Sequence, residues 1–176
     1  VGILFPATGC GVLQPAFEQG LLDTPWYMTD GVKDAGLASL CGLGTALDGM
    51  KGTAPGAAAG EALEAFSAAY SQVSEDGSGN FIFAPQAYDA VMLMAISAAA
   101  NGVTGPEIVS GLVEASSGGE KCIGVSCIAL AADGVDVDYV GASGEIELNQ
   151  AVDPTAATYD IWTTEGDTNP VLKSVD

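Results

Sequence analysis

The sequence lacks histidine and holds few basic residues. Its 176 residues contain no histidine, and 4 lysines and arginines stand against 23 aspartates and glutamates, a formal net charge of −19. Histidine is the side chain used most often for proton transfer near neutral pH and for metal binding. A negative field of this size also repels phosphate backbones and anionic lipid headgroups. We therefore exclude nucleic acid as a partner and predict no catalytic residue, no metal and no cofactor.

Long apolar runs are also absent. The longest, residues 90–100, is interrupted by Ser97 and is shorter than the roughly 20 residues that span a bilayer, so it predicts a buried helix. The printed sequence does not begin with the charged and apolar segments of a signal peptide, so localisation has to be argued from other features. Hydrophobic residues make up 48% of the chain and charged residues 15%, which favours a folded domain over disorder.

The four cysteines form no metal-binding pattern. Cys10, Cys41, Cys122 and Cys127 are an even number, without a CxxC spacing or a histidine. We predict a disulfide between Cys122 and Cys127, which would close a short loop, and a second one between Cys10 and Cys41. The alternative is four buried thiols that act as small hydrophobes in a reducing compartment.

Short apolar segments and turn residues alternate along the chain. The strands we expect are 1–5, 26–29, 81–83, 135–140, 145–148 and 156–163, and the helices are 11–20, 61–70, from about 87 onward, and 106–115. Thr104 and Glu107 predict a capping box at the last of these helices. Strands that alternate with helices and end in a cluster of strands indicate an α/β fold with a mainly parallel sheet and flanking helices. Because the chain begins inside an expected strand, we expect it to be a fragment.

Two motifs that suggest other chemistry are weak. Gly9 and Gly11 follow the first expected strand, as in a dinucleotide-binding turn, but Gln14 stands where the third glycine belongs. An ordinary strand-to-helix turn is the better interpretation, and a Rossmann-type nucleotide-binding enzyme is the less favoured alternative. The acidic clusters lack the spacing of a calcium-binding EF-hand loop.

Several segments, taken in order, resemble one family. They are Pro-Trp-Tyr-Met-Thr-Asp-Gly at 25–31, Leu-Asp-Gly-Met-Lys-Gly-Thr-Ala-Pro at 47–55, Ala-Tyr-Asp-Ala-Val at 87–91, the helix at 106–115, Gly-Ala-Ser-Gly-Glu-Ile at 141–146 and Tyr-Asp-Ile-Trp at 159–162. This series is similar to the type I periplasmic binding proteins, in the branch that includes leucine/isoleucine/valine-binding proteins of ABC importers. The resemblance spans nearly the whole chain but only the C-terminal half of such a protein.

The resemblance implies two Rossmann-like lobes that trap a ligand as they close. Residues 1–55 would be part of the second lobe, residues 56–150 part of the first lobe, and residues 151–176 a return to the second lobe with a C-terminal tail. The small and flexible residues at 54–60 agree with a lobe boundary there. The partner for this fold would be the N-terminal half of the same protein, which is expected to hold the ligand carboxylate.

The resemblance also implies a set of ligand-binding residues. Asp30, at the carboxyl edge of an expected strand and followed by Gly31, takes the position that receives the ammonium of an amino-acid ligand. Thr8, in the loop after the first strand, and Gln86 and Tyr88, at the entry of the long helix, resemble residues that face the ligand. This fold serves many solutes.

The function implied is that of the solute-binding component of an ABC transporter. It would be periplasmic or extracellular, with or without a lipid anchor, and would deliver a small polar ligand, such as an amino acid, to a membrane permease. A ligand-sensing receptor domain of the same fold is the alternative.

Overall fold

The structure, a computed structural model, describes residues 6–74 and 82–175 and divides into two compact units. Unit 1 comprises the residues up to Pro55 together with Tyr159–Val175, and unit 2 comprises Gly56–Thr158. The chain thus leaves unit 1 at 55/56 and returns at 158/159, whereas the sequence suggested 55/56 and 150/151. Which lobe of a complete binding protein each unit represents stays a prediction. The strand expected at residues 1–5 lies outside the described residues.

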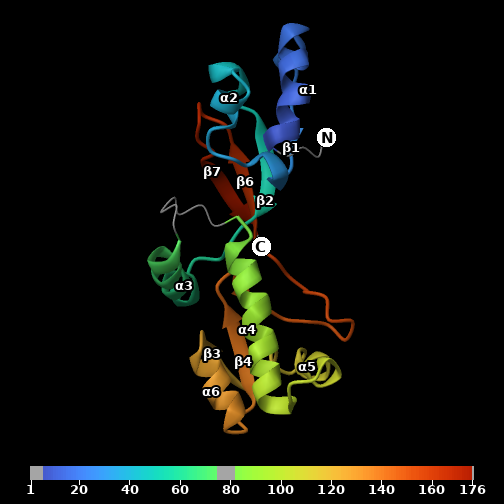
Figure 1. The fold of residues 1–176 in the computed structure, drawn as a ribbon, viewed down its shortest axis with the longest axis vertical. Helices are drawn as coiled ribbons and strands as arrows, with labels where there is room; N and C mark the ends of the chain where they lie inside the picture. Colours follow the sequence, from blue (N-terminus) through green and yellow to red (C-terminus); the bar gives the residue numbers. More distant parts are fainter. Residues whose placement is uncertain (1–5, 75–81, 176) are drawn as a thin grey trace. The chain divides into compact units, whose positions relative to one another are not determined.

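Unit 1 combines a four-stranded sheet with one long helix and several short ones. Its elements are α1 (Pro6–Glu18), η1 (Leu21–Asp23), β1 (Tyr27–Met28), η2 (Asp30–Val32), α2 (Leu37–Leu40), η3 (Gly44–Leu47), β2 (Lys51–Pro55), β6 (Tyr159–Thr163) and β7 (Val171–Val175). The strand order is β1-β2-β6-β7. Figure 1 shows this unit in blue and cyan with the red strands of the chain's end.

The helix predicted at 11–20 is present but begins earlier, at Pro6. Proline suits a first helical turn because that turn needs no backbone N–H. Gly20 follows with a left-handed φ of 68°, which confirms the stop expected there. Leu13 is fully buried, whereas Phe17, one turn later, is 51% exposed, so only one of the two apolar residues faces the core.

The core of unit 1 lies against one face of its sheet. Trp162 of β6 is fully buried together with Met28 and Ala54 from the neighbouring strands. A side chain at Gly52, which pairs with Trp162, would place its Cβ 2.3 Å from the indole ring. Glycine at 52 therefore lets the indole lie directly on the strand.

Unit 2 packs helices against a three-stranded sheet of order β3-β4-β5. Its elements are α3 (Glu61–Val73), α4 (Ala84–Asn101), α5 (Gly105–Gly111), β3 (Glu120–Ile123), α6 (Ser126–Ala132), β4 (Val137–Gly141) and β5 (Gly144–Glu145). Helix α4, green in Figure 1, runs along β4 and also contacts α5 and α6. Met92, Leu93 and Ile96 of α4 are buried in the core, which confirms the buried helix predicted there. No helix among the described residues is long and apolar enough to cross a membrane.

The α/β class with flanking helices is confirmed, but the sheets are mixed rather than mainly parallel. Strands β1 and β2 pair in parallel, as do β3 and β4, while the described pairings of β6, β7 and β5 are antiparallel. Strands β5 and β7 each follow the preceding strand of their sheet after a connection, and β6 joins the sheet of unit 1 after the chain has passed through unit 2. The expectation of a parallel sheet came from the βαβ segments alone.

Other sequence predictions have mixed outcomes. The capping box of Thr104 and Glu107 is present. The strand expected at 81–83 is wrong for its described part, because residues 82 and 83 form the turn that leads into α4. Four elements have no counterpart among the sequence predictions, namely β2, β3, α6 and β7.

Both cysteine pairs are joined in the structure. Cys10 of α1 is bonded to Cys41 at the end of α2, with 5.0 Å between their Cα atoms and a separation of 31 residues. Cys122 of β3 is bonded to Cys127 of α6, with Cα atoms 5.5 Å apart and a separation of 5. The first bond ties α1 to the rest of unit 1, and the second closes a local turn.

We predict that thiol titration of the denatured, unreduced protein finds no free thiol. The chain-entropy model gives about 4 kcal/mol of stabilisation for the long loop and about 2 kcal/mol for the short one. Cys10→Ser/Cys41→Ser should therefore lower the free energy of unfolding more than Cys122→Ser/Cys127→Ser in chemical denaturation. Four titratable thiols in the parent chain would refute both bonds.

The loop between β6 and β7 is anchored to α2 by Asp167. The Asp167 carboxylate accepts hydrogen bonds from the Ser39 hydroxyl and from the Ser39 backbone N–H at 2.9 Å. The Asp167 carbonyl accepts another from Gly36 N–H at 3.1 Å. The bond from the Ser39 hydroxyl, followed by that from its backbone, holds the pKa of Asp167 below the ordinary value of 3.8.

A lowered pKa makes this anchor sensitive to acid. Its stabilisation is present above pH 3.8, the ordinary aspartate value, and is lost as the pH falls through the lower pKa of the folded state. Asp167→Asn should flatten the dependence of unit 1 stability on pH between about 4 and 2 in denaturation experiments. Glu18→Gln is the matched control, because no hydrogen bond within the described residues reaches the Glu18 side chain. An unchanged acid profile in Asp167→Asn would contradict the assignment.

Candidate functional site

Asp30 lies where the sequence analysis placed it, at the carboxyl end of β1. Thr29 continues the strand in an extended conformation, and Asp30 opens the single turn η2. Val32, the last residue of η2, is fully buried in the core and fixes the turn. The Asp30 carbonyl accepts a hydrogen bond from Lys33 N–H at 2.9 Å, and Gly31 occupies the middle of the turn. Asp30 is half-buried.

The Asp30 carboxylate has no compensating partner in the part of the chain that the structure describes. The nearest cation in sequence, Lys33, is bonded instead to Asp160 of β6 at 3.2 Å, and the side chains of this pair are 13% and 14% exposed. Asp160 also accepts a hydrogen bond from Ser174. The hydroxyl of Thr29 is buried without a partner among the described residues. Within the described residues, two consecutive side chains at the end of β1 therefore lack a partner, the half-buried carboxylate of Asp30 and the buried hydroxyl of Thr29.

Thr8 differs from its prediction in local structure. It is the third residue of α1 and exposed, whereas the sequence suggested a loop after the first strand. The helix begins at Pro6, so the expected loop is already helical at Thr8. Asp30, Gly31 and Thr8 all belong to unit 1.

Gln86 and Tyr88 lie in the first turns of α4, in unit 2. The Gln86 amide nitrogen donates a hydrogen bond to the Gly56 carbonyl at 2.6 Å, while its Oε1 is buried without a partner among the described residues. The Tyr88 ring is 5.2 Å from the ring of Phe66 on α3, which in turn is 5.5 Å from Tyr70. Burial, and then the charge of Asp89, raise the pKa of the Tyr88 hydroxyl. This end of α4 therefore combines an aromatic cluster with an acceptor that has no donor in the described part of the chain.

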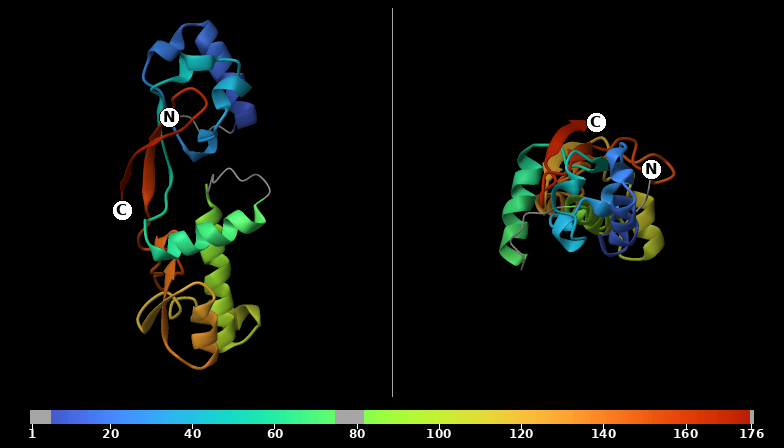
Figure 2. Two further views of the ribbon diagram at one scale, coloured as in Figure 1. Left: turned by 90° about the vertical axis from the view of Figure 1, so that its left-hand side faces the viewer. Right: turned by 90° about the horizontal axis from the view of Figure 1, so that it is seen from above.

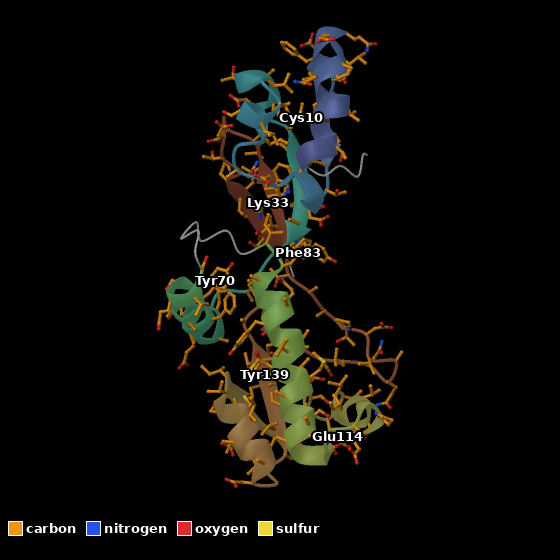
Figure 3. All side chains as sticks on the ribbon, in the orientation of Figure 1. Cys10, Lys33, Tyr70, Phe83, Glu114 and Tyr139 are labelled. Atoms are coloured by element: carbon orange, nitrogen blue, oxygen red, sulfur yellow. A yellow bond between two sulfur atoms is a disulfide. The ribbon has the colours of Figure 1, made fainter. Side chains whose placement is uncertain are left out.

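Phe83, just before α4, was missed as a candidate. Its φ of 62° lies in the left-handed region, and its side chain is 46% exposed. Such a conformation costs a bulky residue about 1–3 kcal/mol and tends to occur where function requires it. Figure 3 labels Phe83 at the start of α4. A sequence motif gives no signal for it, because a positive φ at a non-glycine residue depends on the surrounding structure.

Asp89 was also missed, and its side chain accepts four hydrogen bonds. It is 2% exposed and accepts hydrogen bonds from the Tyr139 hydroxyl at 2.8 Å, the Ala142 N–H at 2.7 Å, and the N–H and hydroxyl of Ser143 at 2.8 and 2.6 Å. Tyr139 lies on β4 beside α4 (Figure 3). A Cβ at Gly141 would lie 2.6 Å from the carboxylate, so the strand passes directly over it.

This network is structural. Both carboxylate oxygens of Asp89 are occupied by donors, so none is left for a ligand. Burial, then the charge of Asp89, raise the pKa of Tyr139 and keep it a hydrogen-bond donor. The Ser143 carbonyl accepts a hydrogen bond from Ala58 N–H at 3.0 Å, so the turn that Asp89 holds is also tied to the segment that enters unit 2. The sequence does contain a signal for this network, because Asp89 is the acid within an otherwise apolar helical segment, where a buried charge needs partners.

Comparison with known proteins gives the fold. No protein-family model and no curated protein sequence matches the chain. Among solved structures, it is similar to the leucine-binding protein LivK from Thermotoga maritima, with 16% identity and a TM-score of 0.64 over 99% of this chain and 43% of that one. LivJ from Streptococcus pneumoniae, in complex with isoleucine, has 18% identity and a TM-score of 0.64 over 98% of this chain and 42% of that one.

A third similar structure is a solute-binding protein of an ABC transporter from R. palustris in complex with benzoate. Its identity is 18% and its TM-score 0.54, over 85% of this chain and 35% of that chain. These likenesses confirm the fold that the sequence motifs indicated, that of type I periplasmic binding proteins, over less than half the length of the matched proteins. At these identities they establish the fold alone.

We predict that Asp89→Ala lowers the free energy of unfolding by roughly 3–5 kcal/mol, because it leaves buried donors on Tyr139, Ala142 and Ser143 without an acceptor. Tyr139→Phe removes one of these donors and should cost about 1–2 kcal/mol. The measurement is chemical denaturation followed by far-UV circular dichroism. Asp136→Ala, an exposed acid of the same unit, is the control and should change stability by less than about 0.5 kcal/mol. A loss below about 1 kcal/mol in Asp89→Ala would show that the network is dispensable.

Proposed function

We propose that the chain is part of an extracytoplasmic solute-binding protein of an ABC transporter, and that its ligand carries a positive group which pairs with Asp30. The observation that carries the proposal is the Asp30 carboxylate, which has no partner among the described residues while Lys33 is committed to Asp160. A free, half-buried carboxylate at the end of a strand is a natural acceptor for an ammonium group.

The chemistry of Asp30 favours an amino acid over a simple carboxylate. Two of the similar structures are named for leucine binding or hold isoleucine, and the third holds benzoate. Benzoate has no positive group, so an unpaired Asp30 would repel it. The chain carries a net charge of −19 and few cations that could balance an anionic ligand. We therefore assign a zwitterionic or cationic metabolite to this protein.

Gln86 and Tyr88 belong to unit 2, where Oε1 of Gln86 is buried without a partner among the described residues. Their contact with the ligand is kept as a prediction of the family resemblance. Whether Thr8 and Gly31 contact the ligand stays a prediction of the family resemblance.

Location and partners follow from the same proposal. Two disulfides suit an oxidising compartment outside the cytoplasm. The partners would be a membrane permease and the remainder of the binding protein, since the chain spans less than half the length of the matched structures. For that reason the ligand experiment requires the protein that contains the rest of the fold.

We expect calorimetric titration of that longer protein against amino acids, amines and benzoate to show binding of an amino acid and none of benzoate. Asp30→Asn should weaken the binding by about ten- to a hundredfold, or about 1.5–3 kcal/mol, because it removes a charge-assisted hydrogen bond. Asp34→Asn, which removes the same charge four residues later, is the matched control and should leave the affinity unchanged. Equal affinities for the parent and Asp30→Asn would remove Asp30 from the site, and tight binding of benzoate would refute the ligand class.

A further inference from the structure

The ion pair of Lys33 and Asp160 lies on the core side of the unit 1 sheet. Asp160 pairs with Ala54 of β2 and stands two residues before Trp162 on β6, so it points to the same face as that buried tryptophan. Lys33 reaches it from the turn after β1, 127 residues earlier in the chain. The left panel of Figure 2 shows the helices of unit 1, in blue and cyan, on one side of the teal and red strands. The pair is largely shielded from water, since only 13% and 14% of its two side chains are exposed.

Both oxygens of the Asp160 carboxylate are engaged. Its Oδ2 pairs with the Lys33 ammonium at 3.2 Å, and its Oδ1 accepts a hydrogen bond from the Ser174 hydroxyl at 2.7 Å. Ser174 is the Cα partner of Asp160 on the neighbouring strand β7. Strand β6 lies inside the sheet, between β2 and β7. The carboxylate that holds Lys33 is therefore itself held in place by the adjacent strand.

Asp30 is the alternative partner for Lys33. Asp30 opens the 3₁₀ turn η2, and the Lys33 N–H donates to the Asp30 carbonyl at 2.9 Å. Side chains three residues apart in such a turn lie one above the other, whereas those of consecutive residues such as Lys33 and Asp34 diverge. A mostly buried ammonium that loses its partner needs another, because an unpaired buried charge is costly. Without Asp160, Lys33 would therefore pair with the Asp30 carboxylate.

Cations are scarce in this chain, so the position of each one matters for the charge of the site. The sequence has 4 basic residues against 23 acidic ones. Lys51 and Lys173 of unit 1 are exposed and form no ion pair within the described residues, whereas Lys33 is paired and mostly buried. Lys33 is also the cation nearest in sequence to Asp30. Its position decides whether the Asp30 carboxylate keeps an unbalanced negative charge.

We propose that Asp160 is a positioning residue for the candidate site. It holds the Lys33 ammonium against β6 and thereby keeps the Asp30 carboxylate available for the positive group of a ligand. This inference rests on the proposed function, because it takes Asp30 as the residue that binds this group. Asp160 acts through Lys33 and determines specificity by charge, since Lys33 on Asp30 would remove the preference for a cation.

Calorimetric titration of the longer binding protein, with leucine and isoleucine as probes, tests the effect on binding. Asp160→Asn should weaken binding by about tenfold or more, because the ligand ammonium then has to displace Lys33 from Asp30. Lys33→Gln should bind at least as tightly as the parent, and Lys33→Gln/Asp160→Asn should recover the parent affinity to within about threefold. A purely structural ion pair predicts a different pattern, since Lys33→Gln breaks the same pair and would weaken binding as much as Asp160→Asn.

A stability cycle in the 176-residue chain tests the placement of Lys33 without any ligand. In the parent, Asp30→Asn and Lys33→Gln should change the folding equilibrium constant independently. In the Asp160→Asn background the two substitutions should be coupled by about threefold or more, because the new ion pair joins their side chains. Lys51→Gln removes a cation from β2 and is the matched control, which should show no coupling to Asp30 in either background. Chemical denaturation gives the constants, and circular dichroism checks that each variant folds.

Ser174→Ala is a milder variant at an exposed position, and it replaces Asp160→Asn in both experiments if that variant does not fold. It keeps both charges of the pair but frees one oxygen of Asp160, so it should weaken binding by about twofold or more, and Lys33→Gln should cancel this loss. Equal losses of affinity in Lys33→Gln and Asp160→Asn, or no coupling in the Asp160→Asn background, would overturn the inference. An affinity that Asp30→Asn leaves unchanged would instead contradict the proposed function, and the stability cycle would still decide where Lys33 is held.

Discussion

The buried carboxylate of Asp89 is the constraint on which unit 2 depends. It brings together residues more than 50 positions apart, from the second turn of α4 to the turn between β4 and β5. Among the described residues, the partners of this carboxylate are two backbone amides and two hydroxyls, and no cation pairs with it. The same turn then binds the chain segment at Ala58. One side chain thereby sets the geometry of the helix, the strand ends and the entering chain.

In unit 1, distant segments are held together by an ion pair and a disulfide. Lys33 and Asp160 link the turn that carries Asp30 to the central strand β6, and Cys10 and Cys41 link α1 to α2. The pairing of Lys33 bears on the proposed ligand, because it leaves the Asp30 carboxylate without a cation among the described residues. Lys33 and Asp160 thus form a structural ion pair, while the candidate binding charge on Asp30 lies only three residues from Lys33. This separation makes the ligand proposal specific for a positive group.

The sequence predicted local features better than long-range ones. Helix boundaries followed from short-range chemistry, as at Gly20 and at the capping box of Thr104 and Glu107. The position of Asp30 at the end of a strand was predicted from the turn residues that follow this strand. By contrast, β7 is exposed along its whole length, so it has no alternation of apolar and polar residues that would reveal it. The left-handed Phe83 and the partners of Asp89 depend on contacts distant in sequence, which periodicity does not encode.

Trp162, fully buried on the strand at Gly52, has a spectroscopic consequence. The chain has 2 tryptophans, and both Trp26 and Trp162 belong to unit 1. Intrinsic tryptophan emission therefore reports on unit 1 alone, whereas Tyr70, Tyr88 and Tyr139 are the tyrosines of unit 2. Water that reaches the indole of Trp162 on unfolding would shift its emission to longer wavelength. Tryptophan emission accordingly follows unit 1 alone, while far-UV circular dichroism, to which the helices of both units contribute, is dominated by the longer helices of unit 2.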